Sequence, residues 1–173
     1  VAVSEDVQNC ADEGIQIFGG MGFSEDAPME SAWRDARIAR IYEGTNEINR
    51  LLSVAELGKR AVISKELNLK KPGAKIPSQL IKKMLPFNHE NDFEIIANMK
   101  SIFLLLLDAT GRKYKAELEH EQEIVLNLSN ILAEAFIAES AFLRVQKLKD
   151  KQGFDQEKLD VMRAMVKINI YNA

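Results

Sequence analysis

The chain has 173 residues, of which 46% are hydrophobic and 28% are charged, with a formal net charge of -3 at pH 7. This composition is typical of a globular protein, and the acidic balance lacks the basic footprint of nucleic-acid-binding proteins. The single cysteine, Cys10, excludes an internal disulfide. No cysteine–histidine grouping has the spacing of a metal site, so we expect no metal and no nucleic-acid partner.

The apolar runs of the sequence are short. The longest, Ile102 to Leu107, ends at Asp108, whereas a helix that crosses a bilayer needs about 20 residues. The sequence therefore predicts no transmembrane segment. The chain begins at Val1 without an initiator methionine and ends at Ala173 inside a helix-like pattern, so we expect it to be a fragment of a larger protein.

Apolar residues recur at helical spacing along nearly the whole chain, which predicts an all-α fold. A first helix is predicted from about Val3 to Phe18. It ends at Gly19-Gly20, because glycine adopts the backbone conformations that end helices, and a glycine turn through Gly22 follows. A second helix is predicted from Pro28 to about Ile38, with Asp26 as its cap.

The segment Tyr42-Glu43-Gly44-Thr45 interrupts the helical pattern. Thr45 offers a hydroxyl cap for a third helix from Asn46 to about Val62. Glu43 is therefore expected just ahead of a helix N-terminus.

Composition changes between residues 63 and 86, where Pro72, Gly73 and Pro77 break the helical pattern. This basic stretch predicts a linker between two helical units. It is either a solvated linker or a patch for peripheral contact with an anionic membrane, to which each basic residue contributes about 1 kcal/mol. Its lysines are Lys65, Lys70, Lys71, Lys75, Lys82 and Lys83.

Residues 87–173 are predicted to form an accessory helical domain. Asn91 and Glu94 resemble a capping box at the start of its first helix. The apolar stripes of its helices favour packing in an antiparallel bundle. The stripes comprise Ile95, Met99, Ile102 and Leu106, then Ile124, Leu128, Ile131, Ala135, Ala138, Phe142 and Val145, and last Leu159, Met162 and Val166.

Glu43 is the strongest candidate for chemistry. Its carboxylate stands beside Gly44 and is open to an approaching ligand, while Tyr42 can limit water, and desolvation raises the pKa of a carboxylate toward values that suit a general base. The alternative is an acid near a helix N-terminus, which the macrodipole stabilises by less than about 1 kcal/mol. Taken alone, the residue favours this alternative, because acids in a first turn are common.

Two neighbouring features are equally ambiguous by themselves. Gly19, Gly20 and Gly22 would let a flat or phosphorylated cofactor approach the backbone, but they would also simply end a helix. Arg34-Asp35 is typical of a local ion pair on a solvated face.

The order and spacing of three segments resemble the closing part of the acyl-CoA dehydrogenase family. They are Gln16-Ile17-Phe18-Gly19-Gly20-Met21-Gly22, Arg34-Asp35-Ala36-Arg37-Ile38 and Ile41-Tyr42-Glu43-Gly44-Thr45-Asn46-Glu47-Ile48. The resemblance covers roughly residues 3 to 60. It implies that residues 1–62 are part of the C-terminal domain of that family, which is an antiparallel four-helix bundle. The continuation beyond Arg60 is similar in architecture to the very-long-chain branch, in which a further helical domain follows a basic segment.

The resemblance implies a FAD-dependent enzyme that oxidises acyl-CoA to trans-2-enoyl-CoA in fatty-acid β-oxidation. It implies that Glu43 removes the α-proton while the β-hydride passes to the flavin, that the Glu43 N–H polarises the thioester carbonyl, and that Gly44 lies along the substrate. Contacts with FAD are implied for Gln16, Ile17, Phe18, Gly19, Gly20, Thr45, Asn46 and Glu47. The first five would touch the adenosine-pyrophosphate half of a FAD held mainly by a neighbouring subunit.

The family also implies partners and a location. These are an electron-transfer flavoprotein, a homo-oligomer that is a dimer or a tetramer, and a cytoplasmic position in a bacterium or the mitochondrial matrix side in a eukaryote. The rest of the flavin and acyl-chain site comes from other domains in this family, so we expect the isolated fragment to be inactive, to lack FAD and to self-associate. The alternative function is a non-catalytic helical association or oligomerisation module derived from the same family.

One rival site is present in the sequence. Glu117 and His120 have the Glu-x-x-His spacing of di-iron helical bundles. Such a site needs a second copy of the motif and two further carboxylates, and the sequence has no second Glu-x-x-His. A chance match on a polar face is therefore expected.

Overall fold

The computed structural model describes residues 1–60, 92–149, 151 and 153–172. All secondary-structure elements in these ranges are helical, which confirms the predicted all-α class. By its contacts the chain divides into two compact units, Val1–Glu56 and Leu57–Ala173. The predicted linker of residues 63–86 lies outside the described residues, so the division of the chain at that segment stays a prediction.

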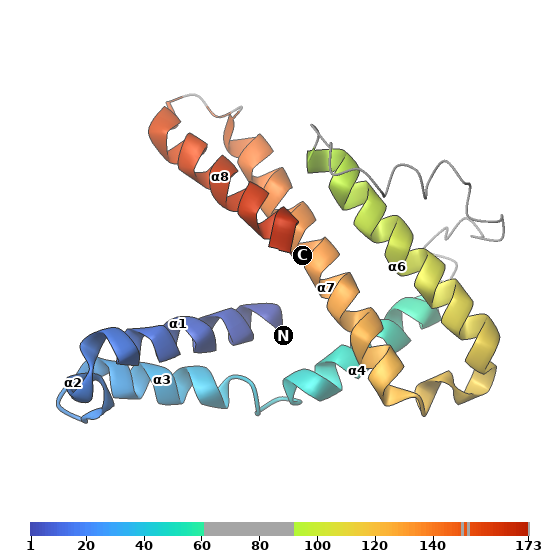
Figure 1. Cartoon of the computed structure of the whole chain (residues 1–173), viewed down its shortest axis with the longest axis horizontal. Coiled ribbons are helices and arrows are strands. Elements are labelled where there is room, and N and C mark those ends of the chain that lie inside the picture. The colour runs from blue at the N-terminus through green and yellow to red at the C-terminus, as the bar shows by residue number, and fades with distance from the viewer. Residues whose placement is uncertain (61–91, 150, 152, 173) are drawn as a thin grey trace. The chain divides into compact units, whose positions relative to one another are not determined.

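The first unit is built on a helical hairpin. Helix α1 (Ala2–Phe18) and helix α3 (Pro28–Ile38) run antiparallel and pack side by side, joined through the short helix α2 (Gly20–Phe23), as Figure 1 shows. Ala11 of α1 and Ala36 of α3 are buried. Their small side chains let the two backbones approach each other.

The glycine segment is helical rather than a simple turn. Helix α1 ends at Gly19, whose φ of 61° lies in the left-handed region, and this confirms the predicted helix stop. The predicted glycine turn is wrong, because the chain winds at once into α2. A Cβ on Gly22 would lie 2.7 Å from the carbonyl oxygen of Ile15, so glycine is needed for α2 to pack against α1.

The start of α3 differs from the prediction by one residue. Pro28 occupies the first turn, as expected, but the N-cap is Ala27, without a side-chain hydrogen bond. Asp26 is therefore one position too early to cap the helix, and it accepts a hydrogen bond from the Ser24 hydroxyl at 3.0 Å instead. Helix α4 (Asn46–Lys59) begins where the sequence predicts.

The described part of the second unit contains three long helices. They are α6 (Asp92–Tyr114), α7 (Gln122–Lys149) and α8 (Gln156–Asn172), and the 3-10 helix η2 (Lys115–Glu119) joins α6 to α7. Helix α7 packs against both α6 and α8. Figure 1 shows α6 and α8 along α7, the arrangement of a small helical bundle.

The core of the second unit lies between α7 and its two neighbours. It is formed by Ile96, Ala138, Val145, Leu159, Val166 and Ile170. The predicted α7 stripe is confirmed, because four of its members are buried and the other three are half-buried. The buried members are Leu128, Ala135, Ala138 and Val145, and the half-buried ones are Ile124, Ile131 and Phe142. In α8, Leu159 and Val166 are buried as predicted.

The predicted stripe of α6 has the wrong phase. The buried residues of α6 are Ile96 and Phe103, with 2% and 4% of their surface exposed, and neither belongs to the predicted stripe. Leu106, which does belong to it, is 40% exposed. Ile95 and Met99 only flank the core. Asn91, half of the predicted capping box, lies outside the described residues.

Helix α7 is long and apolar enough to cross a membrane when judged by length and composition alone. Its buried side chains pack against α6 and α8. This is the position that the central helix of a bundle occupies, so its apolar character has an explanation within the fold. The predicted absence of a transmembrane segment stays a prediction.

Candidate active site

The segment between α3 and α4 is a tight turn that carries Glu43. The backbone N–H groups of Ile41 and Tyr42 bond back to the carbonyl of Ile38 at 2.9 and 3.2 Å. Glu43 then has φ 56° and Gly44 has φ 89°, so two successive residues are left-handed. For a residue with a side chain this conformation is rare and is found mainly where the surrounding structure imposes it.

The Glu43 side chain is exposed in the described chain. Its neighbour Tyr42 is 54% exposed, so the expected shielding of Glu43 from water by Tyr42 is wrong for this chain by itself. The turn instead presents Glu43 openly, and the absence of a side chain at Gly44 leaves the backbone beside it accessible.

The N-terminus of α4 follows directly. The Thr45 Oγ1 accepts a hydrogen bond from the N–H of Ile48 at 3.3 Å, which is the predicted hydroxyl cap. The Asn49 amide donates to the carbonyl of Gly44 at 2.8 Å. The pKa of Glu47 lies below its ordinary value, because its carboxylate accepts hydrogen bonds from its own backbone N–H and from the Thr45 hydroxyl. Glu47 is thus held as an anion at the helix terminus.

Asn46 has a structural position. Its side chain is buried, with 3% of its surface exposed, and its amide group bonds to Ser4 and Glu5 of α1 at 3.0 and 3.3 Å. Its backbone N–H bonds to the carbonyl of Arg40 at 3.1 Å, which closes the turn. The predicted contact of Asn46 with a flavin stays a prediction.

The other predicted site segment, Gln16–Gly20, lies at the far end of the hairpin. Helix α1 has 17 residues, which corresponds to roughly 25 Å at 1.5 Å per residue. The turn with Glu43 contacts the first residues of α1 through Asn46, whereas Gln16 to Gly20 form its last turn and the entry to α2. The structure therefore does not bring the two predicted segments together within one chain.

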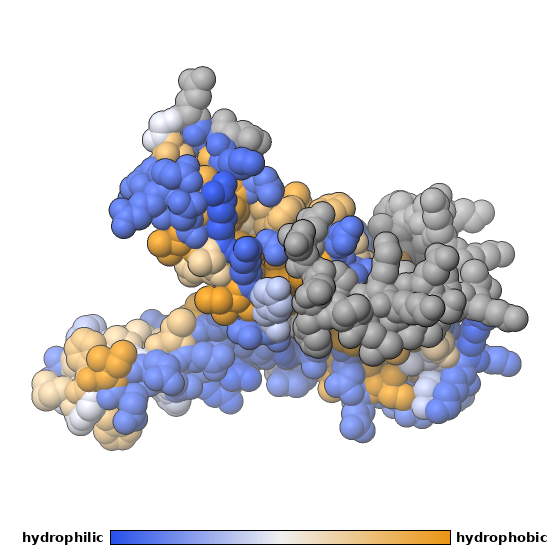
Figure 2. Space-filling view, turned by 45° about the horizontal axis from the view of Figure 1, so that its top comes forward, coloured by the Kyte–Doolittle hydropathy of each residue, from blue (hydrophilic) through white to orange (hydrophobic). Residues whose placement is uncertain are grey.

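The α2 end of the hairpin presents apolar side chains to solvent. Figure 2 shows hydrophobic surface gathered at this end of the first unit. The residues are Ile17, Phe18, Met21 and Phe23, which are 81%, 51%, 56% and 81% exposed. A contiguous apolar surface of this kind marks a place where another surface docks.

Arg34 and the Glu-x-x-His pair have ordinary surroundings. Arg34 pairs with Glu30 at 3.3 Å rather than with Asp35, because residues four apart share a helix face and adjacent residues do not. Glu117 lies in η2 and His120 follows it, so the two are not on one α-helical face. The described residues contain no group of three His, Cys, Asp or Glu side chains that could hold a metal ion.

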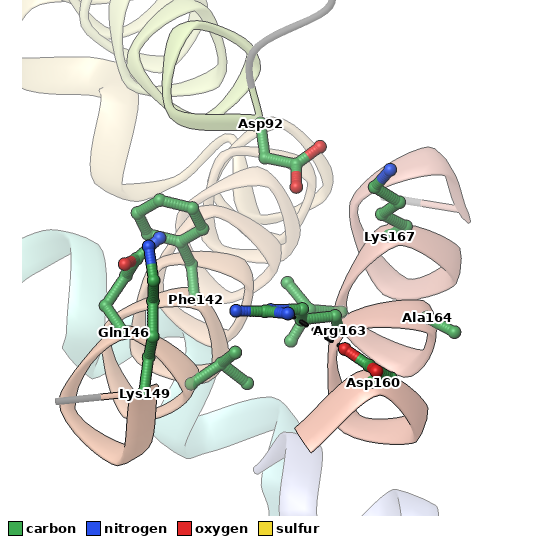
Figure 3. A pocket seen from close by; sticks show the side chains of 10 residues that line it. Asp92, Phe142, Gln146, Lys149, Asp160, Arg163, Ala164 and Lys167 are labelled. Atoms are coloured by element: carbon green, nitrogen blue, oxygen red, sulfur yellow. Dashed lines mark hydrogen bonds and ion pairs between the residues drawn. The ribbon is translucent and has the colours of Figure 1, made fainter. Parts of the chain in front are cut away.

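The second unit contains a cavity of about 390 Å³ that is lined mainly by α7 and α8. In Figure 3 the side chains of Lys149, Arg163 and Lys167 surround it together with Asp92 and Asp160. Arg163 pairs with Asp160 at 2.8 Å, so opposite charges offset one another there. The cavity includes none of the predicted site residues.

The sequence reasoning did not single out Glu5 and Arg50. Their side chains form an ion pair of 2.6 Å between α1 and α4, and Arg40 lies 3.9 Å from the same carboxylate. The partners are 45 residues apart, so no local pattern links them. The sequence contains both the acid on α1 and the arginine one turn into α4. It does not show that they pair, because the pairing arises only when the hairpin brings the two helices together.

Comparison with known proteins gives the same family for both parts of the chain. Residues 1–58 and residues 98–173 match two family models, each described as the C-terminal domain of acyl-CoA dehydrogenase. A probable acyl-CoA dehydrogenase of Bacillus subtilis is 35% identical over 158 residues, which cover 88% of this chain and 26% of that protein. The human mitochondrial short-chain specific acyl-CoA dehydrogenase is 47% identical over 57 residues, or 33% of this chain and 14% of that protein.

A solved structure supports the same relationship. The crystal structure of an acyl-CoA dehydrogenase complexed with FAD from Bacillus anthracis has 33% sequence identity and a TM-score of 0.83 over 96% of this chain and 29% of that one. The chain thus spans about a quarter of the length of these two bacterial relatives. With both of its matched segments assigned to that C-terminal domain, the chain belongs to the acyl-CoA dehydrogenase family.

Proposed function

We propose that this chain is the C-terminal helical part of a FAD-dependent acyl-CoA dehydrogenase and that Glu43 is its catalytic base. The observation that carries the proposal is the placement of Glu43, an exposed carboxylate in a left-handed turn between Tyr42 and Gly44. Thr45 caps the following helix and so fixes the end of that turn.

This placement suits proton abstraction next to a thioester. The Glu43 carboxylate would take the α-proton of an acyl-CoA, and its backbone N–H would donate to the thioester oxygen, where negative charge develops. Gly44 would let the acyl chain pass close to the backbone. Because Glu43 is exposed in the described chain, the exclusion of water that makes a carboxylate a stronger base would come from other parts of the enzyme.

The residues around the α1–α2 junction fit a flat group that approaches the backbone. A Cβ on Gly19 or Gly20 would meet no atom within 4 Å, so the space beside both backbones is open. Gln16 to Gly20 would hold the adenosine-pyrophosphate half of FAD, and Thr45, Asn46 and Glu47 would contact FAD at the other end of the hairpin. When bound, FAD would supply the acceptor for the β-hydride of the substrate.

The separation of these segments supports an oligomeric enzyme. Since Gln16–Gly20 and Glu43–Glu47 lie at opposite ends of α1, one chain would serve two FAD molecules, of which one belongs mainly to a neighbouring subunit. The same proposal includes a dimer or tetramer, electron transfer to an electron-transfer flavoprotein, and a role in fatty-acid β-oxidation.

Membrane contact through residues 63–86 would be tested by liposome binding after neutralising the six lysines.

The test is a Glu43→Gln variant in the full-length dehydrogenase that carries this chain. Steady-state oxidation of acyl-CoA with an artificial electron acceptor should fall by roughly 10²- to 10⁴-fold, the usual contribution of a general base. Glu25→Gln, which removes an exposed acid from the turn before α3, is the matched control and should leave turnover unchanged.

The alternative function is a helical association module derived from the family. The exposed apolar side chains around α2, such as Ile17 and Phe23, favour it because they offer a docking surface. Near-normal acyl-CoA turnover by the Glu43→Gln variant would defeat the catalytic proposal and leave this alternative.

A further inference from the structure

A polar cluster joins the beginning of α1 to the beginning of α4. The Arg50 guanidinium lies 2.6 Å from the Glu5 carboxylate and that of Arg40 lies 3.9 Å from it. The Asn46 amide donates to Glu5 at 3.3 Å and bonds with Ser4 at 3.0 Å. Asn46 is buried, and the exposed fractions of the Glu5 and Arg50 side chains are 26% and 17%, so the cluster is largely shielded from water.

Glu5 contacts both sides of the turn that carries Glu43. Arg40 precedes the turn, and Asn46 and Arg50 follow it, so one carboxylate holds the two ends of a seven-residue loop. The bond from the Asn46 N–H to the Arg40 carbonyl, at 3.1 Å, closes the same loop from the backbone side. The carboxylate that pairs with Arg50 and accepts from Asn46 comes from α1, which lies far from the turn in sequence.

The charge of Glu5 is stable near neutral pH. Partial burial by itself raises the pKa of Glu5, but the hydrogen bond and charge of Arg50, the hydrogen bond of Asn46 and the charge of Arg40 outweigh it and lower the pKa below its ordinary value. The stabilisation by the ionised carboxylate is therefore fully present above that ordinary value and is lost only as the pH falls through the lowered one.

The turn needs such a restraint because of its backbone. Glu43, with φ 56°, and Gly44, with φ 89°, are both left-handed, and a residue like glutamate leaves this region when its surroundings no longer hold it. A change of backbone conformation at Glu43 would move its carboxylate and its N–H together.

We propose that Glu5 is a positioning residue of the dehydrogenase, which acts through Arg40, Asn46 and Arg50 to hold Glu43 in the conformation that meets the substrate. This inference rests on the proposed function of Glu43. Glu5 itself lies on α1 and is not among the residues that we propose to contact the substrate or FAD. Its effect is on the rate of proton abstraction rather than on binding.

The experiment measures anaerobic reduction of the bound FAD by acyl-CoA in the full-length holoenzyme. Glu5→Gln should slow the reduction by roughly 10- to 100-fold, since a misplacement of about 1 Å costs about this much, while FAD content and acyl-CoA affinity stay at wild-type values. Glu5→Asp keeps the carboxylate and should recover part of the rate. Glu13→Gln, an exposed acid on the same helix, is the control and should react like wild type.

A second background separates positioning from general loss of structure. In a Glu43→Gln enzyme, Glu5→Gln should slow the reduction much less than in the wild-type background, because no carboxylate is left to position and only the N–H of residue 43 is displaced. The two changes are then strongly non-additive. Equal slowing in both backgrounds, or a wild-type rate in Glu5→Gln alone, would overturn the proposal.

Two further outcomes are informative. If Glu43→Gln by itself reacts at the wild-type rate, the proposed function fails and the role of Glu5 fails with it. If Glu5→Gln does not yield folded holoenzyme, Ser4→Ala replaces it, because it removes the hydroxyl bonded to Asn46 without changing charge. Slowing mainly in the wild-type background would support the proposal, and an unchanged rate would contradict it.

Discussion

Glu43 adopts a backbone conformation that its own side chain disfavours. Its φ is 56°, and a left-handed conformation costs a residue with a Cβ about 1–2 kcal/mol. Such outliers occur where the site needs a group in one particular place. In this turn the conformation brings the carboxylate and the backbone N–H of one residue to the start of α4, where both have a proposed task.

The cost of this conformation can be measured in the full-length enzyme. We expect Glu43→Gly to have a higher thermal unfolding midpoint than Glu43→Gln. Glycine adopts positive φ without steric cost, so removing the strain should raise the free energy of unfolding by about 1 kcal/mol. Both variants should lose activity, since neither has the carboxylate. Comparing the two uncharged variants removes the effect of the lost charge.

Gly44→Ala is the matched control and should move the midpoint in the opposite direction. Gly44 has φ 89°, and an added Cβ would lie 3.1 Å from the Oδ1 of Asn49. If Glu43→Gly is no more stable than Glu43→Gln, while Gly44→Ala is destabilised, Glu43 is not strained.

Sequence alone made Glu43 the candidate base, but it gave no indication of which residues hold Glu43 in place. The residue stood out because three segments followed one another in a recognised order, whereas its chemistry alone was ambiguous. Glu5 lies 45 residues from Arg50, and no sequence pattern near Glu5 indicates that the two residues pair. A long-range ion pair becomes visible only when the hairpin of α1 and α3 fixes where the two helix starts meet.

At the scale of elements, the prediction of the buried helix face succeeded for α7 and failed for α6. The predicted apolar stripe of helix α7 contributes Ala138 and Val145 to the core. Helix α6 carries apolar residues around most of its circumference, so spacing could not choose between the stripe of Ile95 and that of Ile96. The packing of α7 and α8 decides for Ile96, which is 2% exposed. Helix α2 was missed because its start depends on contact with α1.

The phase of α6 gives a stability prediction for the second unit. Ile96→Ala should lower the free energy of unfolding by about 2–5 kcal/mol, because it removes fully buried methyl groups and leaves a cavity. Val161→Ala, on the exposed face of α8 with 56% of its surface accessible, should change it by less than about 0.5 kcal/mol. Urea denaturation followed by circular dichroism measures both, and equal midpoints for the two variants would show that Ile96 is not in the core.

At the scale of the whole molecule, the proposed site is shared. The chain spans 26% of its Bacillus subtilis relative, and the two segments proposed to contact FAD lie at opposite ends of one hairpin. Exposed apolar residues such as Ile17 and Phe23 lie beside one of these segments. The geometry therefore suggests a site completed by other domains and by another subunit.

The 173-residue chain expressed alone should therefore lack activity. We expect purified protein without flavin absorbance and without acyl-CoA oxidation, and we expect it to self-associate through its exposed apolar surface. Absorbance spectra and analytical ultracentrifugation measure these properties. Flavin at stoichiometric level that is bleached by acyl-CoA would contradict this prediction, and a monomer would contradict the predicted self-association.

The role of Glu43 is tested most directly by a single turnover. Full-length wild-type and Glu43→Gln enzymes, each loaded with FAD and acyl-CoA under anaerobic conditions, are compared by the rate at which flavin absorbance is bleached. Our account predicts that the variant binds both molecules but is reduced roughly 10²- to 10⁴-fold more slowly. Reduction of the variant at the wild-type rate would contradict the assignment of Glu43 as the base.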